Sequence, residues 1–332
     1  MAADTAFTLV PGLHTGGWIR RDVAGRLREA GAEAYPLTLS GMSGRHGRGE
    51  REGDVRGGTG ADLETHIADG PRAGEGAAVR PPSEAERPAH PRPFLIDVPE
   101  RPRERVGRVD LHLPDGEGPC PAVVFVHGGP VPEVPEGTRP TPRDWPTFLG
   151  YARLVADLGA VGVTMDHRLH DVTDFGRAAR DVRDAVAVVR AHPRVDAGRV
   201  ALWFFSAGGL LSADWLAAPP HWLRCLALTY PLLTPLPGWG VPGPRFRPAE
   251  AVRAAGRLPV VLTRVGRERA EFAATVEEFL AAALSAGVGV RVVDVPSAAH
   301  GFETSDHSDE ARRSVGLAAR AVLSHLGTAP AG

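Results

Sequence analysis

The sequence predicts an α/β fold in which a mostly parallel central sheet carries helices on both faces. From residue 94 onward, short apolar runs typical of strands alternate with longer stretches of helical periodicity. Three of these runs, at 122–127, 160–166 and 200–205, are almost continuously apolar, as strands covered on both faces must be. The pattern therefore favours strand–helix–strand units.

The strands are expected to begin with an antiparallel pair, separated by a charged turn, and to continue as parallel strands. We predict them at 94–98, 106–113, 122–127, 160–166, 200–205, 223–229, 259–264 and 289–295. Helices are predicted at 147–158, 174–191, 248–255, 268–286 and 308–326. The helix at 174–191 shows the clearest apolar stripe, made by Phe175, Ala178, Val182, Ala185, Val186 and Val189.

The N-terminal part of the chain has a different character. Short strands are predicted at 7–10 and 32–39, with an amphipathic helix at 18–30 between them. From about 41 to 93, Gly, Arg, Glu and Pro dominate, and such a segment buries too little apolar surface to offset its ordering entropy. We therefore divide the chain into a fragment at 1–70, a linker at 71–93 and a main domain at 94–328.

Composition and charge restrict the class of partner. The net charge is −2 and the pI is about 6.7, so no overall basic field would attract nucleic acid or an anionic membrane. The N-terminus lacks the pattern of a secretion signal, and no stretch is apolar enough to span a membrane. Cys120 and Cys225 form neither a disulfide framework nor a metal-binding spacing. These features predict a cytoplasmic protein with a small-molecule partner.

Ser206 is the first candidate for chemistry. It lies where the apolar strand at 200–205 runs directly into SAGGLLSADWL, a strand-to-helix junction. A sharp turn at such a junction lifts a serine hydroxyl above the sheet edge, and a helix N-terminus stabilises negative charge that develops there. The alternative is that Ser206 merely caps the helix, since serine is a favoured N-cap residue.

The sequence His127-Gly128-Gly129-Pro130 follows the first long buried strand. Glycines in this place let backbone N–H groups approach a substrate oxygen, as an oxyanion hole requires. An ordinary Gly-Pro turn is the alternative. His127 itself is expected to have a structural hydrogen-bonding role.

A base and its orienting carboxylate are expected after the last two strands. His300, in SAAHGFE, follows the strand at 289–295 and can reach back to Ser206 across the carboxyl edge of the sheet. Glu268 lies in the loop after the strand at 259–264 and is our choice for the carboxylate. The alternatives are that Glu268 only favours a helix N-terminus, or that Asp294 takes its place.

Taken in order, VVFVHGGP, MDHRL, DAGRVALWFFSAGG, the VGRE loop and AHGF resemble the α/β-hydrolase superfamily over about residues 94–328. The resemblance is strongest to the dienelactone-hydrolase-like and hormone-sensitive-lipase-like esterases. It implies a triad of Ser206, Glu268 and His300, oxyanion donors at Gly128, Gly129 and Ala207, and a minimal cap.

The chain departs from the family's G-x-S-x-G turn at Phe204, which stands two residues before the serine, where the family has glycine. That glycine relieves crowding at a strained turn, so a phenylalanine there either reshapes or weakens the turn. Residues 1–70 separately resemble the opening of a second α/β-hydrolase that lacks a nucleophile segment, and we assign them no catalytic role.

The function expected from these residues is cleavage of a small-molecule carboxylic ester through an acyl-enzyme, with no metal and no organic cofactor. The same triad could serve a peptidase, a thioesterase or an acyltransferase, and a catalytically silent binding protein remains the alternative from another class. Residues 231–247, with Trp239, Phe246 and Trp145, either shape an apolar substrate pocket or form a proline-rich connection.

Overall fold

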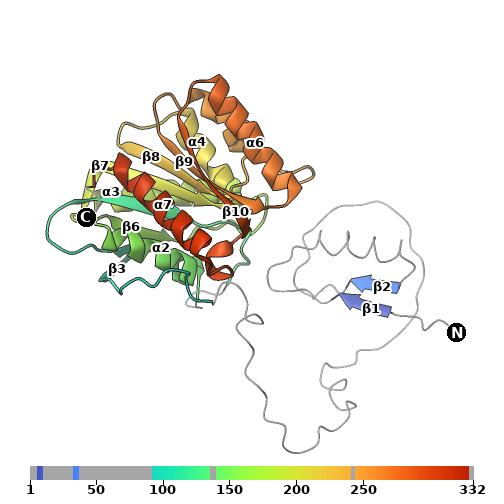
Figure 1. Cartoon of the computed structure of the whole chain (residues 1–332), viewed down its shortest axis with the longest axis horizontal. Helices are drawn as coiled ribbons and strands as arrows, with labels where there is room; N and C mark the ends of the chain where they lie inside the picture. Colours follow the sequence, from blue (N-terminus) through green and yellow to red (C-terminus); the bar gives the residue numbers. More distant parts are fainter. Residues whose placement is uncertain (1–5, 10–32, 37–91, 135–139, 241–243, 329–332) are drawn as a thin grey trace, which may run out of the picture. The chain divides into compact units, whose positions relative to one another are not determined.

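The central sheet has eight strands in the order β10-β9-β8-β7-β5-β6-β4-β3 (Figure 1), and β4 alone runs against its neighbours. The computed structural model describes residues 6–9, 33–36, 92–134, 140–240 and 244–328. The strands of the sheet are β3 (Arg103–Val106), β4 (Val109–His112), β5 (Cys120–Val126), β6 (Val161–Met165), β7 (Val195–Phe205), β8 (Leu223–Thr229), β9 (Val260–Arg267) and β10 (Val290–Ala299). The predicted fold class is confirmed.

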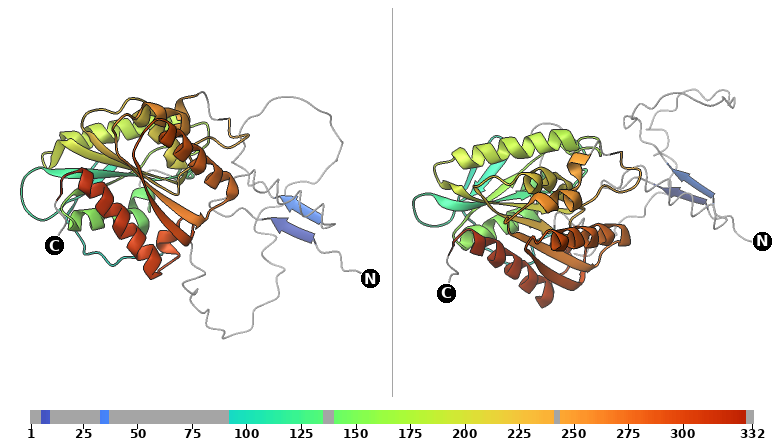
Figure 2. Two further views of the ribbon diagram at one scale, coloured as in Figure 1. Left: turned by 45° about the horizontal axis from the view of Figure 1, so that its top comes forward. Right: turned by 90° about the horizontal axis from the view of Figure 1, so that it is seen from above.

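Helices cover both faces of this sheet. The α-helices are α2 (Pro146–Asp157), α3 (Phe175–Ala191), α4 (Ala213–Ala217), α5 (Pro248–Ala251), α6 (Ala270–Ser285) and α7 (Asp309–His325). Short 3-10 helices are η3 (Pro142–Asp144), η4 (Ser206–Ser212), η5 (Pro244–Phe246), η6 (Val252–Ala254) and η7 (Phe302–Thr304). In the left view of Figure 2, α3 and α6 lie over one face while α2 and α7 lie over the other.

Side-chain alternation along the central strands explains why both faces need helices. In β7, Leu202 and Phe204 join the core cluster under α3 and α6, whereas Trp203 and Phe205 join the cluster under α2 and α7. All four side chains are at most 1% exposed. Because successive strand residues point to opposite faces, a run that is apolar at every position requires a cover on each side.

The first edge of the sheet differs from the prediction. Residues 94–98 form no strand, and the hairpin is instead β3–β4, which turns at Gly107 with a φ of 58°. The backbone N–H of Leu95 donates to the carbonyl oxygen of Glu303 at 3.0 Å, so this segment packs beside η7 rather than pairing with the sheet. An apolar run was therefore wrongly assigned to a strand.

The sequence did not predict β3 because the strand consists mainly of charged residues. Its sequence, RERV, places arginines on one side of the strand, and Arg105 Nε donates to the wholly buried carboxylate of Asp110 in β4 at 2.6 Å. Arg103 pairs with the same carboxylate. An edge strand held by buried ion pairs has no hydrophobic alternation for a sequence pattern to detect.

The N-terminal unit, residues 1–82, is described by itself and contains β1 (Ala6–Leu9) paired in parallel with β2 (Glu33–Pro36). These strands overlap the predicted strands at 7–10 and 32–39. The predicted helix at 18–30 lies outside the described residues. So does most of the proposed linker, and the division at residues 70 and 93 stays a prediction.

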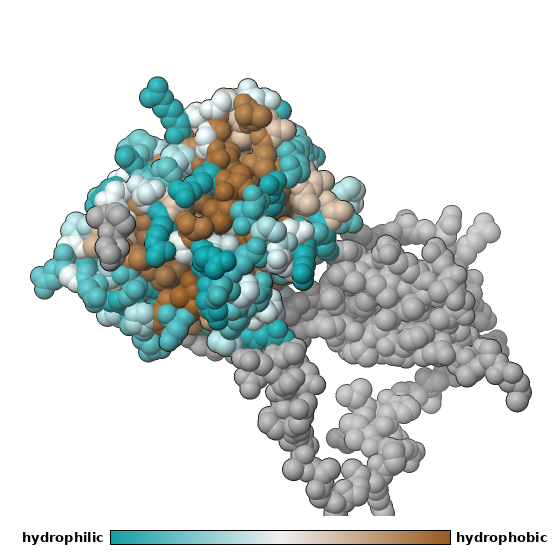
Figure 3. Space-filling model, in the orientation of Figure 1, coloured by the Kyte–Doolittle hydropathy of each residue, from teal (hydrophilic) through white to brown (hydrophobic). Residues whose placement is uncertain are grey.

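The surface of the main unit mixes polar and apolar residues. On the face seen in Figure 3, apolar residues gather between α6 and α7. Leu284 of α6 is 83% exposed and Leu317 of α7 is 50% exposed. Within the described ranges, no helix is both long and apolar enough to cross a bilayer.

Candidate active site

Ser206 occupies a sharp turn between β7 and η4. Its φ is +52°, in the left-handed region that L-residues rarely adopt, and it is one of two described non-glycine residues with a positive φ. Such strain persists only where surrounding structure imposes it, and it is found mainly at functional sites. The side chain stays partly exposed at the carboxyl edge of the sheet.

Glycines surround this turn because no side chain fits there. A Cβ on Gly128 would lie 2.8 Å from Ser206 Cβ, and one on Gly208 would lie 2.4 Å from the carbonyl oxygen of His127. A Cβ on Gly209 would lie 2.6 Å from the carbonyl oxygen of Leu232. The turn is thus packed directly against the segment that follows β5, and the predicted Gly128–Ser206 proximity follows from the adjacency of β5 and β7.

Phe204 does not disturb the turn. Its side chain is fully buried in the core under α3 and α6, and its backbone pairs with Val126 of β5 and Leu228 of β8. The side chain points into the sheet face while the strain falls on Ser206, two residues later. Compared with a glycine, a phenylalanine at this position therefore fills space in the core and does not reshape the turn.

His300 lies between Ser206 and Glu268. The Ser206 hydroxyl donates to His300 Nε2 at 2.7 Å, and His300 Nδ1–H donates to Glu268 Oε2 at 2.6 Å. The ring packs on Tyr230, with centroids 4.5 Å apart, and edge-on to Phe272 at 5.4 Å. Three side chains that come from different loops of the sequence are thereby connected in one hydrogen-bonded chain.

Glu268 is well placed for the orienting role and Asp294 is not. The Glu268 side chain is only 6% exposed, and it follows β9 at the carboxyl edge. Asp294 lies within β10, where its carboxylate pairs with Arg264 at 2.8 Å and is half exposed. The fallback carboxylate therefore faces a neighbouring strand instead of the imidazole.

A pair of stacked histidines supports the segment after β5. The rings of His127 and His167 are 3.6 Å apart and nearly parallel. His127 Nδ1–H donates to the carbonyl oxygen of Gly128 at 2.5 Å, and the backbone N–H of His167 donates to His127 Nε2 at 3.3 Å. Burial lowers the pKa of His127 to about 4, so its ring stays neutral and acts as the predicted structural group.

Two of the three predicted oxyanion donors lie beside the serine. Ala207 follows Ser206 directly and is buried, and a Cβ built on Gly128 would lie 3.3 Å from Ser206 Oγ. Gly129 packs beside Leu169 in the loop after β6. The role of all three as oxyanion donors stays a prediction.

Sequence reasoning missed the group that lies behind the imidazole. Tyr151 and Tyr230 donate their hydroxyls to the two oxygens of Glu303, at 3.0 and 2.9 Å, and all three side chains are buried. Glu303 stands three residues after His300 in the same loop. In the sequence it is only the acidic residue that ends HGFE, and nothing there marks it as buried.

Comparison with known proteins places this geometry in context. No family model matches the sequence, and no curated protein sequence matches it. Solved structures do match. Thermogutta terrifontis esterase 2, phosphoramylated by tabun, superposes with a TM-score of 0.54 at 19% identity, covering 71% of this chain and 98% of that one. The chain has the α/β-hydrolase fold.

Two further structures agree. The carboxylesterase EstE1, cloned from a metagenomic library, gives a TM-score of 0.53 at 20% identity over 70% of this chain and 92% of its own. A Pyrobaculum calidifontis esterase gives 0.53 at 21% identity over 70% of this chain and 88% of its own. At identities this low, the likeness supports the fold of the main unit and nothing beyond the fold.

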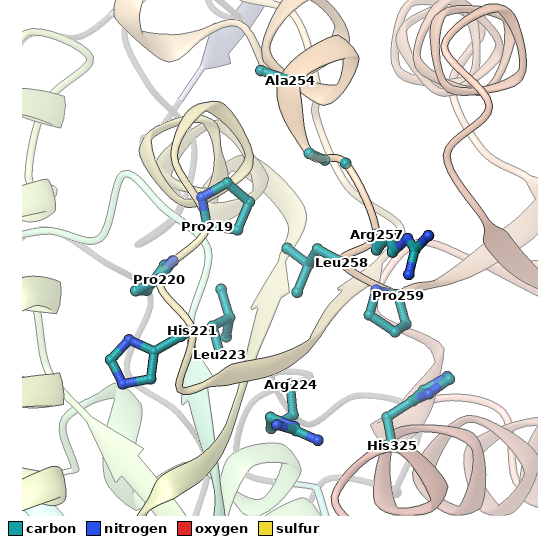
Figure 4. Close-up of a pocket in the computed structure, with 12 residues that line it drawn as sticks. Pro219, Pro220, His221, Leu223, Arg224, Ala254, Arg257, Leu258, Pro259 and His325 are labelled. Carbon is teal, nitrogen blue, oxygen red and sulfur yellow. The ribbon is translucent and has the colours of Figure 1, made fainter.

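In this α/β-hydrolase fold, a pocket of about 560 Å³ (Figure 4) lies at the amino ends of β8 and β9. Ser206 follows the carboxyl end of β7, which is parallel to β8, and so lies at the other end of the strands. Leu223 at the start of β8 and Pro259 just before β9 line it, together with Arg224, Arg257 and His325. Ligands of open α/β sheets bind at the carboxyl ends of the strands, so this pocket plays no part in the candidate site.

For residues 231–247 the sequence left two alternatives, an apolar pocket and a proline-rich connection, and the structure describes all of these residues except 241–243. Phe246 is 3% exposed and its ring packs on Phe175 of α3, with centroids 5.5 Å apart. Arg245 beside it pairs with Asp214 of α4. For Phe246, the reading as a rigid connection that packs on the core is therefore the better one. Among the described residues, no group of three or more His, Cys, Asp or Glu side chains could hold a metal ion.

Proposed function

We propose that this protein is a serine hydrolase that cleaves a carboxylic ester of a small molecule through an acyl-enzyme. The observation that carries the proposal is the continuous chain Ser206 Oγ–H to His300 Nε2 at 2.7 Å and His300 Nδ1–H to Glu268 at 2.6 Å. Those are the contacts that proton removal from a serine nucleophile requires.

The first half of the reaction forms the acyl-enzyme. Ser206 Oγ attacks the ester carbonyl carbon while its proton passes to His300 Nε2, and the carbonyl π electrons move to oxygen. The backbone N–H groups of Gly129 and Ala207, with Gly128 beside them, hold that oxyanion. Collapse of the tetrahedral intermediate breaks the bond to the alcohol, which leaves with the proton from His300.

The second half releases the acid. Water attacks the acyl carbon as His300 takes one of its protons, and Ser206 leaves with that proton from the imidazole. Throughout, the carboxylate of Glu268 fixes the Nδ1–H tautomer and stabilises the imidazolium that forms transiently. No step calls for a metal ion or an organic cofactor.

Two observations support an active site over a silent relative. The Phe204 side chain, which was expected to reshape or weaken the turn, is buried in the core, and Ser206 retains its strained φ of +52°. Several solved structures with this fold are esterases, and one is described as phosphoramylated by tabun. We extend the esterase activity of these proteins to this chain as part of the proposal.

Residues 94–328 contain every proposed site residue and form the catalytic domain in this proposal, whereas the fragment at 1–70 has no catalytic role. We further propose a cytoplasmic location, which the two free thiols, of Cys120 and the buried Cys225, support. The substrate is a small-molecule ester rather than a nucleic acid or a membrane lipid surface.

A substrate panel tests the reaction class. The full chain is assayed with p-nitrophenyl acetate and butyrate, with thioesters of the same acyl groups, and with peptide p-nitroanilides. We expect the oxygen esters to be hydrolysed with kcat/KM at least about tenfold above the thioesters and anilides. Turnover of anilides alone would reassign the protein as a peptidase, and turnover of none would support a binding protein.

A further inference from the structure

Glu303 is a buried acid with no part in the mechanism above. The side chain is wholly buried in η7, and both of its oxygens accept hydrogen bonds from tyrosine hydroxyls. Gly301, with a φ of 70°, turns the chain between His300 and η7. Burying a carboxyl costs free energy unless it is hydrogen-bonded, and here the two tyrosine hydroxyls reduce that cost.

Tyr230 links Glu303 to the candidate site. Its hydroxyl donates to Glu303 Oε2, while its ring packs on His300 with centroids 4.5 Å apart. It is the second described non-glycine residue with a positive φ, at 36°. The backbone of Tyr230, which supports one side of the imidazole, is therefore held in an unfavourable conformation. Backbone strain of this kind is found mainly at functional sites, where it positions a group.

Few other charged or titratable groups face this carboxyl. From α2 comes Tyr151, from the end of β8 comes Tyr230, and from the loop after β10 comes His300, which interacts with Glu303 electrostatically. The segment around Leu95 reaches only the backbone oxygen of Glu303, and Arg312 of α7 donates to Leu95 O instead. Glu268 is hydrogen-bonded to Nδ1 of His300.

We propose that Glu303 is a positioning residue for His300: its carboxyl anchors Tyr230 against the imidazole, and its negative charge helps the imidazole to hold the proton taken from Ser206. The proposal rests on the proposed hydrolase function. It goes beyond the triad because Glu303 touches neither Ser206 nor any reacting atom and acts through Tyr230 and through charge.

The charge of Glu303 changes within the working range of a hydrolase. Burial raises the pKa of the Glu303 carboxyl to about 7, although the two tyrosine hydroxyls and His300 act to lower it. Above pH 7 the carboxylate is mainly ionised and favours the imidazolium, whereas below pH 7 it becomes neutral. Because this pKa lies above that of an exposed glutamate, Glu303 stabilises the fold most at acidic pH and loses that contribution as the pH rises through 7.

Kinetics with three variants test the positioning role. Glu303→Gln removes the charge and keeps the size, Tyr230→Phe removes the anchor and keeps the ring, and Tyr151→Phe is the matched control that removes the other hydroxyl from the same carboxyl. With p-nitrophenyl acetate we expect the first two to lower kcat about tenfold or more, with KM within about twofold, and the control to stay within about threefold. The difference in kcat between the parent chain and Glu303→Gln should shrink as the pH falls below 7, where Glu303 of the parent chain becomes neutral.

Nuclear magnetic resonance separates failure of this inference from failure of the proposed function. The ring-proton shifts of His300, assigned by the signal lost in His300→Asn, are followed against pH in the full chain and in Glu303→Gln, and no turnover is needed. A titration midpoint that moves to lower pH in Glu303→Gln supports the role even if no ester is hydrolysed. Superposable titrations, or equal kinetic loss in Tyr151→Phe and Tyr230→Phe, would overturn it and leave the triad assignment untouched.

Discussion

Ester hydrolysis falls by about 10⁴-fold or more when Ser206 is replaced by alanine, because the attacking oxygen is removed while the rest of the site remains. The substitution deletes one hydrogen bond, to His300 Nε2, and leaves no buried donor unsatisfied. Alanine keeps the Cβ, so the strain at a φ of +52° is the same in both chains. The variant should therefore fold and bind substrate normally. The measurement is kcat/KM for p-nitrophenyl acetate after subtraction of spontaneous hydrolysis.

Ser324→Ala is the matched control for this experiment. Its hydroxyl donates to Ala321 O within α7, far in sequence from every proposed site residue. We expect its activity to equal that of the parent chain within experimental error. Equal activity of Ser206→Ala and the parent chain would remove Ser206 from the mechanism, whereas loss in both variants would indicate a defect of folding.

Gly128→Ala should reduce kcat/KM by about 10²-fold or more although it adds only a methyl group. The new Cβ would lie 2.8 Å from Ser206 Cβ, closer than real Cβ atoms come to one another, and 3.1 Å from the carbonyl oxygen of Phe205, which is a tight contact. Either the serine leaves its hydrogen bond with His300 or the segment after β5 withdraws, and both outcomes spoil the alignment of nucleophile and oxyanion donors.

Gly176→Ala provides the control for the added methyl group. Gly176 lies in the first turn of α3, and nothing lies within 4 Å of a Cβ built on it. Alanine there should leave kcat/KM unchanged and slightly raise the midpoint of thermal unfolding, since alanine favours a helix. Full activity in Gly128→Ala would show that the two segments are further apart than the structure has them.

Much of the site could be predicted because the fold imposes an order on the chain. Ser206, Glu268 and His300 each follow a strand, and the carboxyl ends of parallel strands meet at one edge of a sheet. Local sequence thus sufficed to name residues that are up to 94 positions apart and that prove to be hydrogen-bonded. The order alone also favoured Glu268 over Asp294, which lies inside β10 rather than after a strand.

The remainder depended on tertiary contacts that leave no local signal. Tyr230 and Glu303 come together because η7 packs against the end of β8. The sequence of neither segment predicts this contact. The apolar run at 94–98 looked like a strand because periodicity cannot tell a strand from a segment packed on the outside of a core. The effect of Phe204 was likewise a matter of side-chain direction, which the sequence could not give.

The most direct test of the central claim is the site at which a fluorophosphonate probe attaches to the intact chain. Its phosphorus is attacked only by an activated nucleophile, and fluoride leaves as the bond to oxygen forms. We predict one adduct per chain, mapped by mass spectrometry to Ser206, that is lost in Ser206→Ala and in His300→Asn. A folded chain that takes no adduct, or takes it on another residue such as Ser212, would contradict the account.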